Sequence, residues 1–268
     1  ATSEILIKFF EGVTDKNYDE YISYSGGVAL NVIWNTTLKN KFKNLVIPPH
    51  CNDEGLSLGA VEYLRIKNKL KPFNLEKFPF CQLDETPKEN ISNDTIKKVA
   101  GLLSNGYIVA TYQGNGEIGP RALGNRSILM NPTLPNAKER INLIKKRENY
   151  RPFGCSILKE SALDYFDVEF ENDYMLYVGK PKDSNLKSIT HIDGTCRFQT
   201  VDNTNKYFYN LIKEFYKLSG CPLLLNTSFN INGKPILAST EDAINFYNKS
   251  EIDCLVVGDK IYNKKKAG

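Results

Sequence analysis

Residues 222–230 read Pro222-Leu223-Leu224-Leu225-Asn226-Thr227-Ser228-Phe229-Asn230. A proline followed by three leucines is typical of a short, fully buried strand. Four of the five residues that follow carry hydrogen-bonding side chains, so the polar residues begin where the buried strand ends. Ligands bind at strand ends in α/β sheets. This stretch therefore predicts an α/β fold whose sheet has a ligand site at one edge.

Strand and helix patterns alternate on both sides of this stretch. In the second part of the chain, strands are expected near residues 107–112, 128, 153–158, 174–178, 196–201, 222–226 and 255–257, and helices near 94–104, 137–146, 205–218 and 241–248. In the first part, strands are expected at 21–24 and 45–47 and helices at 3–11, 28–40 and 55–69, the last with Leu58, Val61, Tyr63 and Leu64 on its apolar side. This alternation indicates α/β packing in both parts.

Residues 71–93 separate the two parts. They contain three prolines among mixed charges and show no hydrophobic periodicity, which is typical of a linker. The expected organisation is therefore a first domain over residues 1–70, this linker, and a second α/β domain over residues 94–268 with a mixed, twisted sheet.

The composition is that of a globular protein. The chain has 268 residues, of which 25% are charged and 41% are hydrophobic. Disordered, collagen-like and coiled-coil proteins need compositional biases that this chain lacks. A membrane-spanning helix needs about 20 consecutive apolar residues, and no run of the sequence approaches that length. We expect one large or two modest domains and no membrane partner.

The formal net charge of +4 hides one cationic segment. Residues 121–151 contain eight basic and two acidic residues, a net charge of +6, against −2 for the rest of the chain. Such a segment fits an anionic partner or a solvated basic helix face, and charge counting leaves both interpretations open. Because the charge is confined to one segment, no nucleic-acid partner is expected.

Residues 114–127 place two arginines in a loop of restricted backbone. The segment reads Gly114-Asn115-Gly116-Glu117-Ile118-Gly119-Pro120-Arg121-Ala122-Leu123-Gly124-Asn125-Arg126-Ser127. Guanidinium groups fixed beside glycine backbone suit bidentate recognition of phosphate or carboxylate. Residues 145–154 carry four more cations, and residues 193–197 form a turn that leads an arginine into a strand. Together these segments predict a phosphate-handling site.

Two motifs near the start of the chain are open to a structural and a functional interpretation. Gly26 and Gly27 lie where a strand turns into a helix, and such glycines let backbone approach an anion. A tight strand–helix turn is the favoured interpretation. Asp53, in the loop before the helix at 55–69, is a candidate ligand for a hard cation. An N-cap is the commoner role for an aspartate at such a place, and we favour it.

The cysteines and histidines point to no metal or triad chemistry. Six cysteines occur without a CxxC pair, several of them inside apolar runs. Buried free thiols and the absence of a signal-peptide pattern predict a cytoplasmic protein. His50 and His191 are the only histidines, and their spacing builds no zinc site. A hydrogen-bonded structural role is expected for both.

Taken together, the motifs resemble the O-carbamoyltransferase family of nodulation-factor and antibiotic biosynthesis. The resembling segments follow the family's order across nearly the whole chain, and they are residues 25–31, 53–60, 119–129, 145–153, 193–201 and 226–230. The resemblance implies an actin-like (ASKHA) carbamoyl-transfer domain, represented by residues 1–70, and a YrdC-like domain over residues 94–268. It implies that the second domain forms carbamoyl adenylate from carbamoyl phosphate and ATP. The first domain would then transfer the carbamoyl group to the hydroxyl of a small-molecule acceptor.

The resemblance also implies roles for individual residues. Catalytic roles in holding carbamoyl phosphate or the phosphates of ATP fall to Arg121, Lys145, Arg151 and Arg197. Contacts with substrate or nucleotide fall to Gly26, Gly27, Asn31, Gly119, Arg126, Ser127, Arg147, Asn226, Thr227, Ser228 and Asn230. Asp53 would be a metal ligand of the actin-like domain. The implied cofactors are ATP and Mg²⁺, with a further divalent metal, Fe²⁺ among the candidates, in that domain.

One feature departs from the family pattern. The family's metal site uses an HxxxH pair from the first half of the actin-like domain, and His50 and His191 do not form such a pair. With a start at Ala1, this predicts that the first half of that domain is missing and that the chain alone does not complete carbamoyl transfer. Two alternatives stay open: threonylcarbamoyl-adenylate formation for tRNA modification, and a non-catalytic module that binds nucleotide or carbamoyl phosphate.

Overall fold

The computed structural model describes residues 2–73, 78–82, 91–231 and 233–264. The chain divides into two compact units. Unit 1 consists of the described residues up to Pro79 together with Ile118–Pro120 and Leu176–Val178, and unit 2 consists of the remaining ones. Within the described residues, each helix is too short or too polar to cross a membrane.

Unit 1 combines short helices with one pair of very short strands. Its elements are α1 (Thr2–Val13), β1 (Ile22–Ser23), the 3-10 helix η1 (Gly27–Leu30), α2 (Val32–Lys41), β2 (Leu45–Val46) and α3 (Gly55–Lys67). Strands β1 and β2 pair in parallel, with Ile22 beside Leu45. The strands and helices predicted for this part of the chain are therefore confirmed, with one exception at Asn31.

The helix predicted over residues 28–40 is divided at Asn31. This residue has an extended backbone, with φ −80° and ψ 95°, so η1 ends before it and α2 begins after it. The Asn31 Oδ1 atom accepts a hydrogen bond from Trp34 N at 3.2 Å. That bond satisfies one of the N–H groups that a helix start leaves open, and Asn31 is therefore the N-cap of α2.

Few apolar side chains of unit 1 are buried. The Phe10 ring meets the Tyr24 ring edge-on, with centroids 5.3 Å apart, and lies 5.9 Å from the Phe42 ring. Helix α3, by contrast, has no buried residue. The apolar side predicted for this helix exists in the sequence but is not buried, because periodicity shows which side of a helix would pack and not whether a partner covers it.

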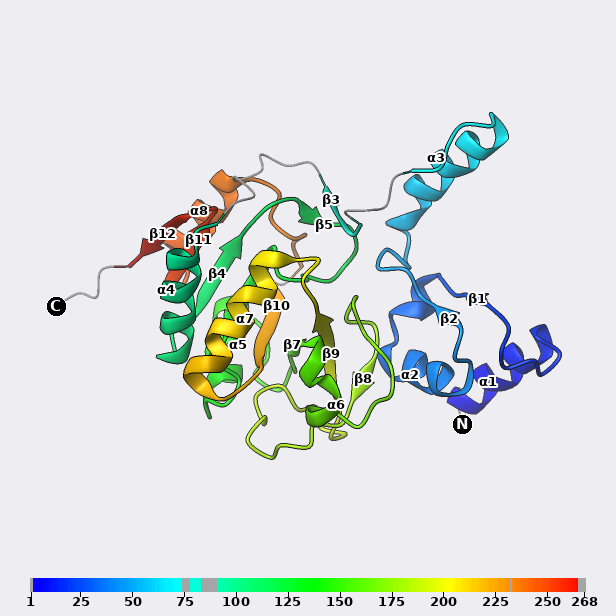
Figure 1. Cartoon of the computed structure of the whole chain (residues 1–268), viewed down its shortest axis with the longest axis horizontal. Helices are drawn as coiled ribbons and strands as arrows, with labels where there is room; N and C mark the ends of the chain where they lie inside the picture. The colour runs from blue at the N-terminus through cyan, green and yellow to red at the C-terminus, as the bar shows by residue number, and fades with distance from the viewer. Residues whose placement is uncertain (1, 74–77, 83–90, 232, 265–268) are drawn as a thin grey trace. The chain divides into compact units, whose positions relative to one another are not determined.

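Unit 2 holds most of an eight-stranded sheet with the strand order β12-β11-β4-β6-β10-β7-β9-β8 (Figure 1). The strands are β4 (Val109–Tyr112), β6 (Arg126–Met130), β7 (Gly154–Leu158), β8 (Val178–Gly179), β9 (Cys196–Val201), β10 (Leu223–Ser228), β11 (Cys254–Val257) and β12 (Lys260–Asn263). The pairs β7–β9 and β11–β4 are parallel, and β4–β6, β6–β10, β10–β7 and β11–β12 are antiparallel. The predicted α/β fold with a mixed sheet is confirmed.

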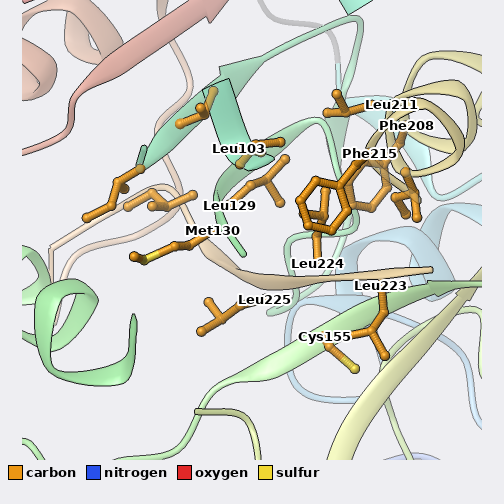
Figure 2. Packing of buried hydrophobic residues seen from close by; sticks show 14 of the residues in the cluster. Leu103, Leu129, Met130, Cys155, Phe208, Leu211, Phe215, Leu223, Leu224 and Leu225 are labelled. Carbon is orange, nitrogen blue, oxygen red and sulfur yellow. The ribbon is translucent and has the colours of Figure 1, made fainter. Parts of the chain in front are cut away.

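Helices cover this sheet and close its hydrophobic core. They are α4 (Asn93–Ser104), α5 (Ala137–Lys145), η2 (Lys159–Ser161), α6 (Ala162–Tyr165), α7 (Lys206–Ser219) and α8 (Thr240–Lys249). Figure 2 shows Leu224 of β10 pointing toward Phe208 and Phe215 of α7, while Leu223 and Leu225 point to the opposite face of the sheet. All five side chains are completely buried. This alternation follows from the two-residue period of a strand and lets β10 fill both faces of the core.

Two stretches differ from the prediction. The strand predicted at 174–178 is reduced to β8, because Met175 has a left-handed backbone with φ +56° that interrupts extended structure. Inside the predicted linker, Phe80–Gln82 form strand β3, which pairs antiparallel with β5 (Gly116–Glu117). Residues 74–77 and 83–90 of that linker lie outside the described residues.

Candidate anion-binding site

A buried lysine lies at the edge of the sheet where β10 ends. Lys145 is the last residue of α5, and only 3% of it is exposed. Its Nζ atom donates to Ser228 O at 2.6 Å, to Ser228 Oγ at 3.1 Å and to Asn230 Oδ1. All three acceptors are neutral. Burial, and secondarily repulsion by Arg147, lowers the pKa of Lys145 to about 7.

The same edge of the sheet carries the start of β9. Strand β10 runs antiparallel to β7, with Asn226 opposite Gly154, and β7 runs parallel to β9. The end of β10 and the starts of β7 and β9 therefore meet. A Cβ atom at Gly154 would lie 2.8 Å from Arg197 O and 3.4 Å from Arg197 Nε, so only glycine leaves room for Arg197 here.

Arg147 and Arg197 complete a group of cations. Arg147 Nε donates to Asn142 Oδ1 at 2.6 Å, and its guanidinium lies 4.2 Å from the centre of the Phe153 ring. Burial, followed by repulsion from Arg151 and Arg197, lowers the pKa of Arg147 to about 10. Arg197 Nε is buried without a hydrogen-bond partner among the described residues. Burial lowers the pKa of Arg197 as well.

These cations are poorly neutralised by the protein itself. Among the described residues, the one acidic side chain at ion-pair distance from Lys145, Arg147, Arg151 or Arg197 is Glu148, whose Oε2 lies 2.7 Å from Arg151 Nε. Half-buried cations that depress each other's pKa are stabilised when an anion enters between them. Two guanidinium forks and an ammonium group suit a phosphate or a carboxylate. The arrangement is therefore a candidate anion-binding site.

Arg126, for which the resemblance implied a ligand contact, binds other parts of the protein in this structure. Its side chain is completely buried. The guanidinium donates from Nη1 to Gln113 O at 2.6 Å and from Nη2 to Gly114 O at 2.9 Å, and it stacks on Tyr112 at 3.6 Å from the ring centre. Position 126 is the first residue of β6, where the strand period turns the side chain into the protein. Arg126 thus holds the start of the glycine-rich segment.

Asn226 and Ser127 are also structural in this geometry. Asn226 is completely buried and donates from Nδ2 to Ala122 O at 3.2 Å and to Ser156 Oγ at 2.8 Å. Ser127, likewise buried, accepts a hydrogen bond from Gly124 N through Oγ at 3.1 Å. Both side chains therefore bind the backbone of residues 122–124, and the ligand contacts implied for them stay predictions.

The remaining residues of the predicted site are distributed over both units. Ser228 and Asn230 contact Lys145, as described above, and Thr227 lies half-buried beside Ile128 in the sheet register. Arg121 is half-buried in unit 2. Gly119, with φ +112°, belongs to unit 1, where an added Cβ would lie 2.3 Å from Pro49 O. A glycine is needed at 119 for this close backbone approach.

The N-terminal motifs have the structural roles of turns and caps. Gly26 has φ +111° and donates its N–H to Cys51 O at 2.5 Å, and Gly27 begins η1. Asp53 is exposed, but the N-cap of α3 is Glu54, without a side-chain capping bond, so the cap predicted for Asp53 is wrong. The described residues contain no group of three His, Cys, Asp or Glu side chains able to hold a metal ion. Within the described part of the chain, Asp53 therefore has no complete set of metal-ligating side chains around it.

Three structurally important residues were not predicted. Glu117, Ser156 and Gln199 are buried polar residues that take part in side-chain hydrogen bonds around residues 122–126. Glu117 lies inside the glycine-rich segment at residues 114–127. A single acidic residue between glycines and arginines could have identified it from the sequence. Ser156 and Gln199 lie in otherwise apolar strands, where a single polar residue gives little indication of its partner.

The fold is that of an α/β protein with a cluster of cations at one edge of its sheet. The family model described as Carbamoyltransferase C-terminus matches residues 100–264, and the one described as Carbamoyltransferase N-terminus matches residues 1–61. The chain belongs to the carbamoyltransferase family, which confirms the resemblance drawn from its motifs.

Curated relatives agree with this assignment. The chain is 37% identical to nodulation protein NolO of Bradyrhizobium diazoefficiens, over 91% of this chain and 49% of that protein. It is 33% identical to the 3'-hydroxymethylcephem-O-carbamoyltransferase of Streptomyces clavuligerus, over 98% of this chain and 53% of the enzyme. An uncharacterized protein of Methanocaldococcus jannaschii is 34% identical, over 98% of this chain and 54% of its own. The chain spans about half the length of these relatives.

The chain is also similar to a solved structure of P. abyssi Sua5 complexed with L-threonine. The similarity extends over 65% of this chain and 49% of the Sua5 chain, with a TM-score of 0.47 and 20% sequence identity. Likeness at this level carries no conclusion about function.

Proposed function

We propose that unit 2 binds carbamoyl phosphate and ATP and activates the carbamoyl group as carbamoyl adenylate, for transfer to the hydroxyl of a small molecule. The single observation that supports this best is the Lys145 network. Its buried ammonium group is bonded only to neutral oxygen atoms and lies near Arg147, which in turn is repelled by Arg197. Membership of the carbamoyltransferase family and similarity to an enzyme named for O-carbamoyl transfer support the reaction class.

The proposed chemistry balances with one molecule of water. Carbamoyl phosphate reacts with water at its carbonyl carbon, the C–O bond to phosphate breaks, and carbamate and phosphate form. A carbamate oxygen then attacks the α-phosphorus of ATP, and pyrophosphate leaves with the electrons of the broken P–O bond. The products are carbamoyl adenylate, phosphate and pyrophosphate. Each step places negative charge on phosphate oxygens, where fixed cations lower the energy.

In this proposal the cations are divided between the two ligands. Lys145, Arg147 and Arg197, together with Arg121, hold the phosphate group of carbamoyl phosphate. Arg151 contacts the phosphates of ATP. An arriving dianion raises the pKa of Lys145 back above 7, so the ammonium form is the one that binds. Ser228 and Asn230, which hold Lys145 in the free protein, contribute hydroxyl and amide groups to the same site.

The finer assignments of the two parts belong to the same proposal. Residues 94–268 would be the YrdC-like adenylate-forming domain, and residues 1–70 part of an actin-like transfer domain. Gly26, Gly27 and Asn31 would contact nucleotide there. Asp53 would be one ligand of a metal in that domain, and no step is assigned to the metal because the described residues do not supply a full ligand set. Mg²⁺ would accompany ATP and reduce the repulsion between its phosphates and the attacking carbamate.

Titration calorimetry with carbamoyl phosphate, combined with an assay for phosphate and pyrophosphate release, tests the proposal. Lys145→Ala and Arg121→Ala should each weaken binding by about 1.5–3 kcal/mol, the contribution of a charge-assisted hydrogen bond, which is about 10–150-fold in Kd. Lys41→Ala is the matched control, because Lys41 pairs with Glu11 in unit 1.

Three results would contradict the proposal. Unchanged affinity in both Lys145→Ala and Arg121→Ala would remove the site. Pyrophosphate release that requires threonine and bicarbonate in place of carbamoyl phosphate would indicate threonylcarbamoyl-adenylate formation. Binding without release of either product would indicate a non-catalytic module.

A further inference from the structure

One buried carboxylate organises the loop that follows Arg121. Glu117 Oε1 accepts hydrogen bonds from three backbone N–H groups: Leu123 at 2.8 Å, Asn125 at 2.9 Å and Arg126 at 3.2 Å. An oxygen that accepts three N–H groups holds their peptide planes in one orientation. The loop has no regular secondary structure of its own before β6 begins at Arg126. Glu117 therefore replaces the backbone partners that a helix or strand would provide.

Other buried side chains hold the carbonyl groups of the same loop. Ala122 O accepts from Asn226 Nδ2 at 3.2 Å, and Leu123 O accepts from Gln199 Nε2 at 3.2 Å. Gly124 O accepts from Thr111 Oγ1 at 3.0 Å. Together with Glu117, these contacts leave the backbone of residues 122–126 little conformational freedom.

Burial removes the Glu117 carboxyl group from water, which costs free energy. Only 4% of the residue is exposed, and burial raises the pKa of its carboxyl group despite the N–H donors and the nearby Arg126. Its second oxygen, Oε2, has no hydrogen-bond partner among the described residues. The backbone of Glu117 is fixed in β5, opposite Phe80 of β3. A buried carboxyl with a single set of partners indicates that holding the loop is its task.

The loop leads directly to the proposed ligand site. Arg121 immediately precedes Ala122, and the Asn226 side chain that binds Ala122 O lies two residues before Ser228, a partner of Lys145. We propose that Glu117 is a positioning residue that fixes the backbone of residues 122–126 and, through it, the position of Arg121. The functional part of this statement rests on the proposed role of Arg121 in phosphate binding.

Amide hydrogen exchange tests the structural part directly. In Glu117→Ala, the amides of Leu123, Asn125 and Arg126 lose their acceptor and should exchange at least about 100-fold faster, while amides within β10 keep their protection. Glu117→Gln retains an Oε1 acceptor and should keep exchange within about tenfold of the unmodified protein. If Glu117→Ala does not fold, Glu117→Asp, one methylene shorter, is measured in its place. Unchanged protection in the Ala or Asp variant, or equal loss in the Gln variant, would overturn the proposal.

A double-mutant cycle tests the link to Arg121, with carbamoyl phosphate as the probe. Glu117→Ala should weaken binding about tenfold in the unmodified background, add nothing in the Arg121→Ala background, and keep its full effect in the Lys145→Ala background. Glu117→Gln should restore affinity. Equal effects of Glu117→Ala in all three backgrounds would show that it does not act through Arg121. If the unmodified protein binds no carbamoyl phosphate, the proposed function fails, and the exchange measurement still decides whether Glu117 holds the loop.

Discussion

Unit 1 and unit 2 differ in where they place their large apolar side chains. Of the twenty large apolar side chains exposed among the described residues, fourteen lie between Ile5 and Leu70. In unit 2 the apolar residues of the central strands are buried in one continuous cluster, together with one side of α7 formed by Tyr207, Phe208, Leu211, Ile212 and Phe215. Since apolar burial is the main source of folding free energy, unit 2 has a large core of its own. Unit 1 rests on a smaller buried set that includes Phe10, Leu38, Phe42, Leu45 and Ile47.

The two units also differ in how they treat charge. Unit 2 buries Glu117, Arg126 and Lys145, each held by backbone or neutral side-chain groups. The cation of unit 1 at Lys41 is instead paired with Glu11 at the surface. Buried charges without counter-ions reduce stability, and only a large core can offset them. The proposed site therefore lies in unit 2, whose larger apolar core offsets the cost of the buried charges.

The largest expected effect separates the two kinds of apolar residue. Leu224→Ala should reduce the free energy of unfolding of unit 2 by about 3–5 kcal/mol, because Leu224 is completely buried against α7 and its loss leaves a cavity. The same change at Leu64, which is 54% exposed on α3, should cost less than about 0.5 kcal/mol. Urea denaturation followed by far-ultraviolet circular dichroism measures both. A loss of stability in Leu64→Ala similar to that in Leu224→Ala would contradict the difference in apolar burial between α3 and the core of unit 2.

The difference between the units was only partly visible in the sequence. Element types and the mixed sheet were predictable, because the leucine run at 223–225 and the strand–helix alternation are strong periodic signals. The exposed side of α3 was not, since its pattern matches that of a packed helix. Side-chain direction at Arg126 was not predictable either, because it depends on the register of β6 against β4 and β10. The cluster of Lys145 with Ser228 and Asn230 joins segments that are more than 80 residues apart in the sequence. The residue types marked each segment as a candidate for ligand binding, but they did not show that the two segments are in contact.

The second effect is the pH dependence of the free energy of unfolding. Lys145 in unit 2 has a lowered pKa and Lys41 in unit 1 a raised one, so the two lysines contribute to it with opposite signs. The folded-state pKa of Lys145 is lowered to about 7 from an ordinary 10.5, so the unfolded chain binds more protons between these values. The stability of the unmodified protein relative to Lys145→Met should therefore rise as the pH increases from 7 toward 10, by on the order of 3 kcal/mol. Chemical denaturation at several pH values measures the difference. If the stability difference between the two proteins stays constant over this pH range, burial does not destabilise the protonated form of Lys145.

Lys41 provides the control for this experiment. Its ion pair with Glu11 raises the pKa of Lys41, so any stability from this pair is present below pH 10 and is lost only as the pH rises through the raised pKa. Lys41→Met should accordingly leave the pH dependence between 7 and 10 unchanged. Carbamoyl phosphate should reduce the pH dependence caused by Lys145, since a bound anion raises its pKa. An unchanged slope with saturating carbamoyl phosphate would place the anion elsewhere.

The smallest effect compares matched helix caps. Asn31 caps α2 in unit 1 through a bond to Trp34 N at 3.2 Å, and Ser239 caps α8 in unit 2 through a bond to Asp242 N at 3.0 Å. Replacing either residue by Ala should cost about 1 kcal/mol. Trp34 is the single tryptophan of the chain, so its fluorescence follows unit 1 alone, whereas circular dichroism is dominated by unit 2. Asn31→Ala should shift only the fluorescence transition and Ser239→Ala only the dichroism transition. Equal shifts of both transitions in either variant would show that the two units unfold together, so that the core of unit 2 also stabilises unit 1.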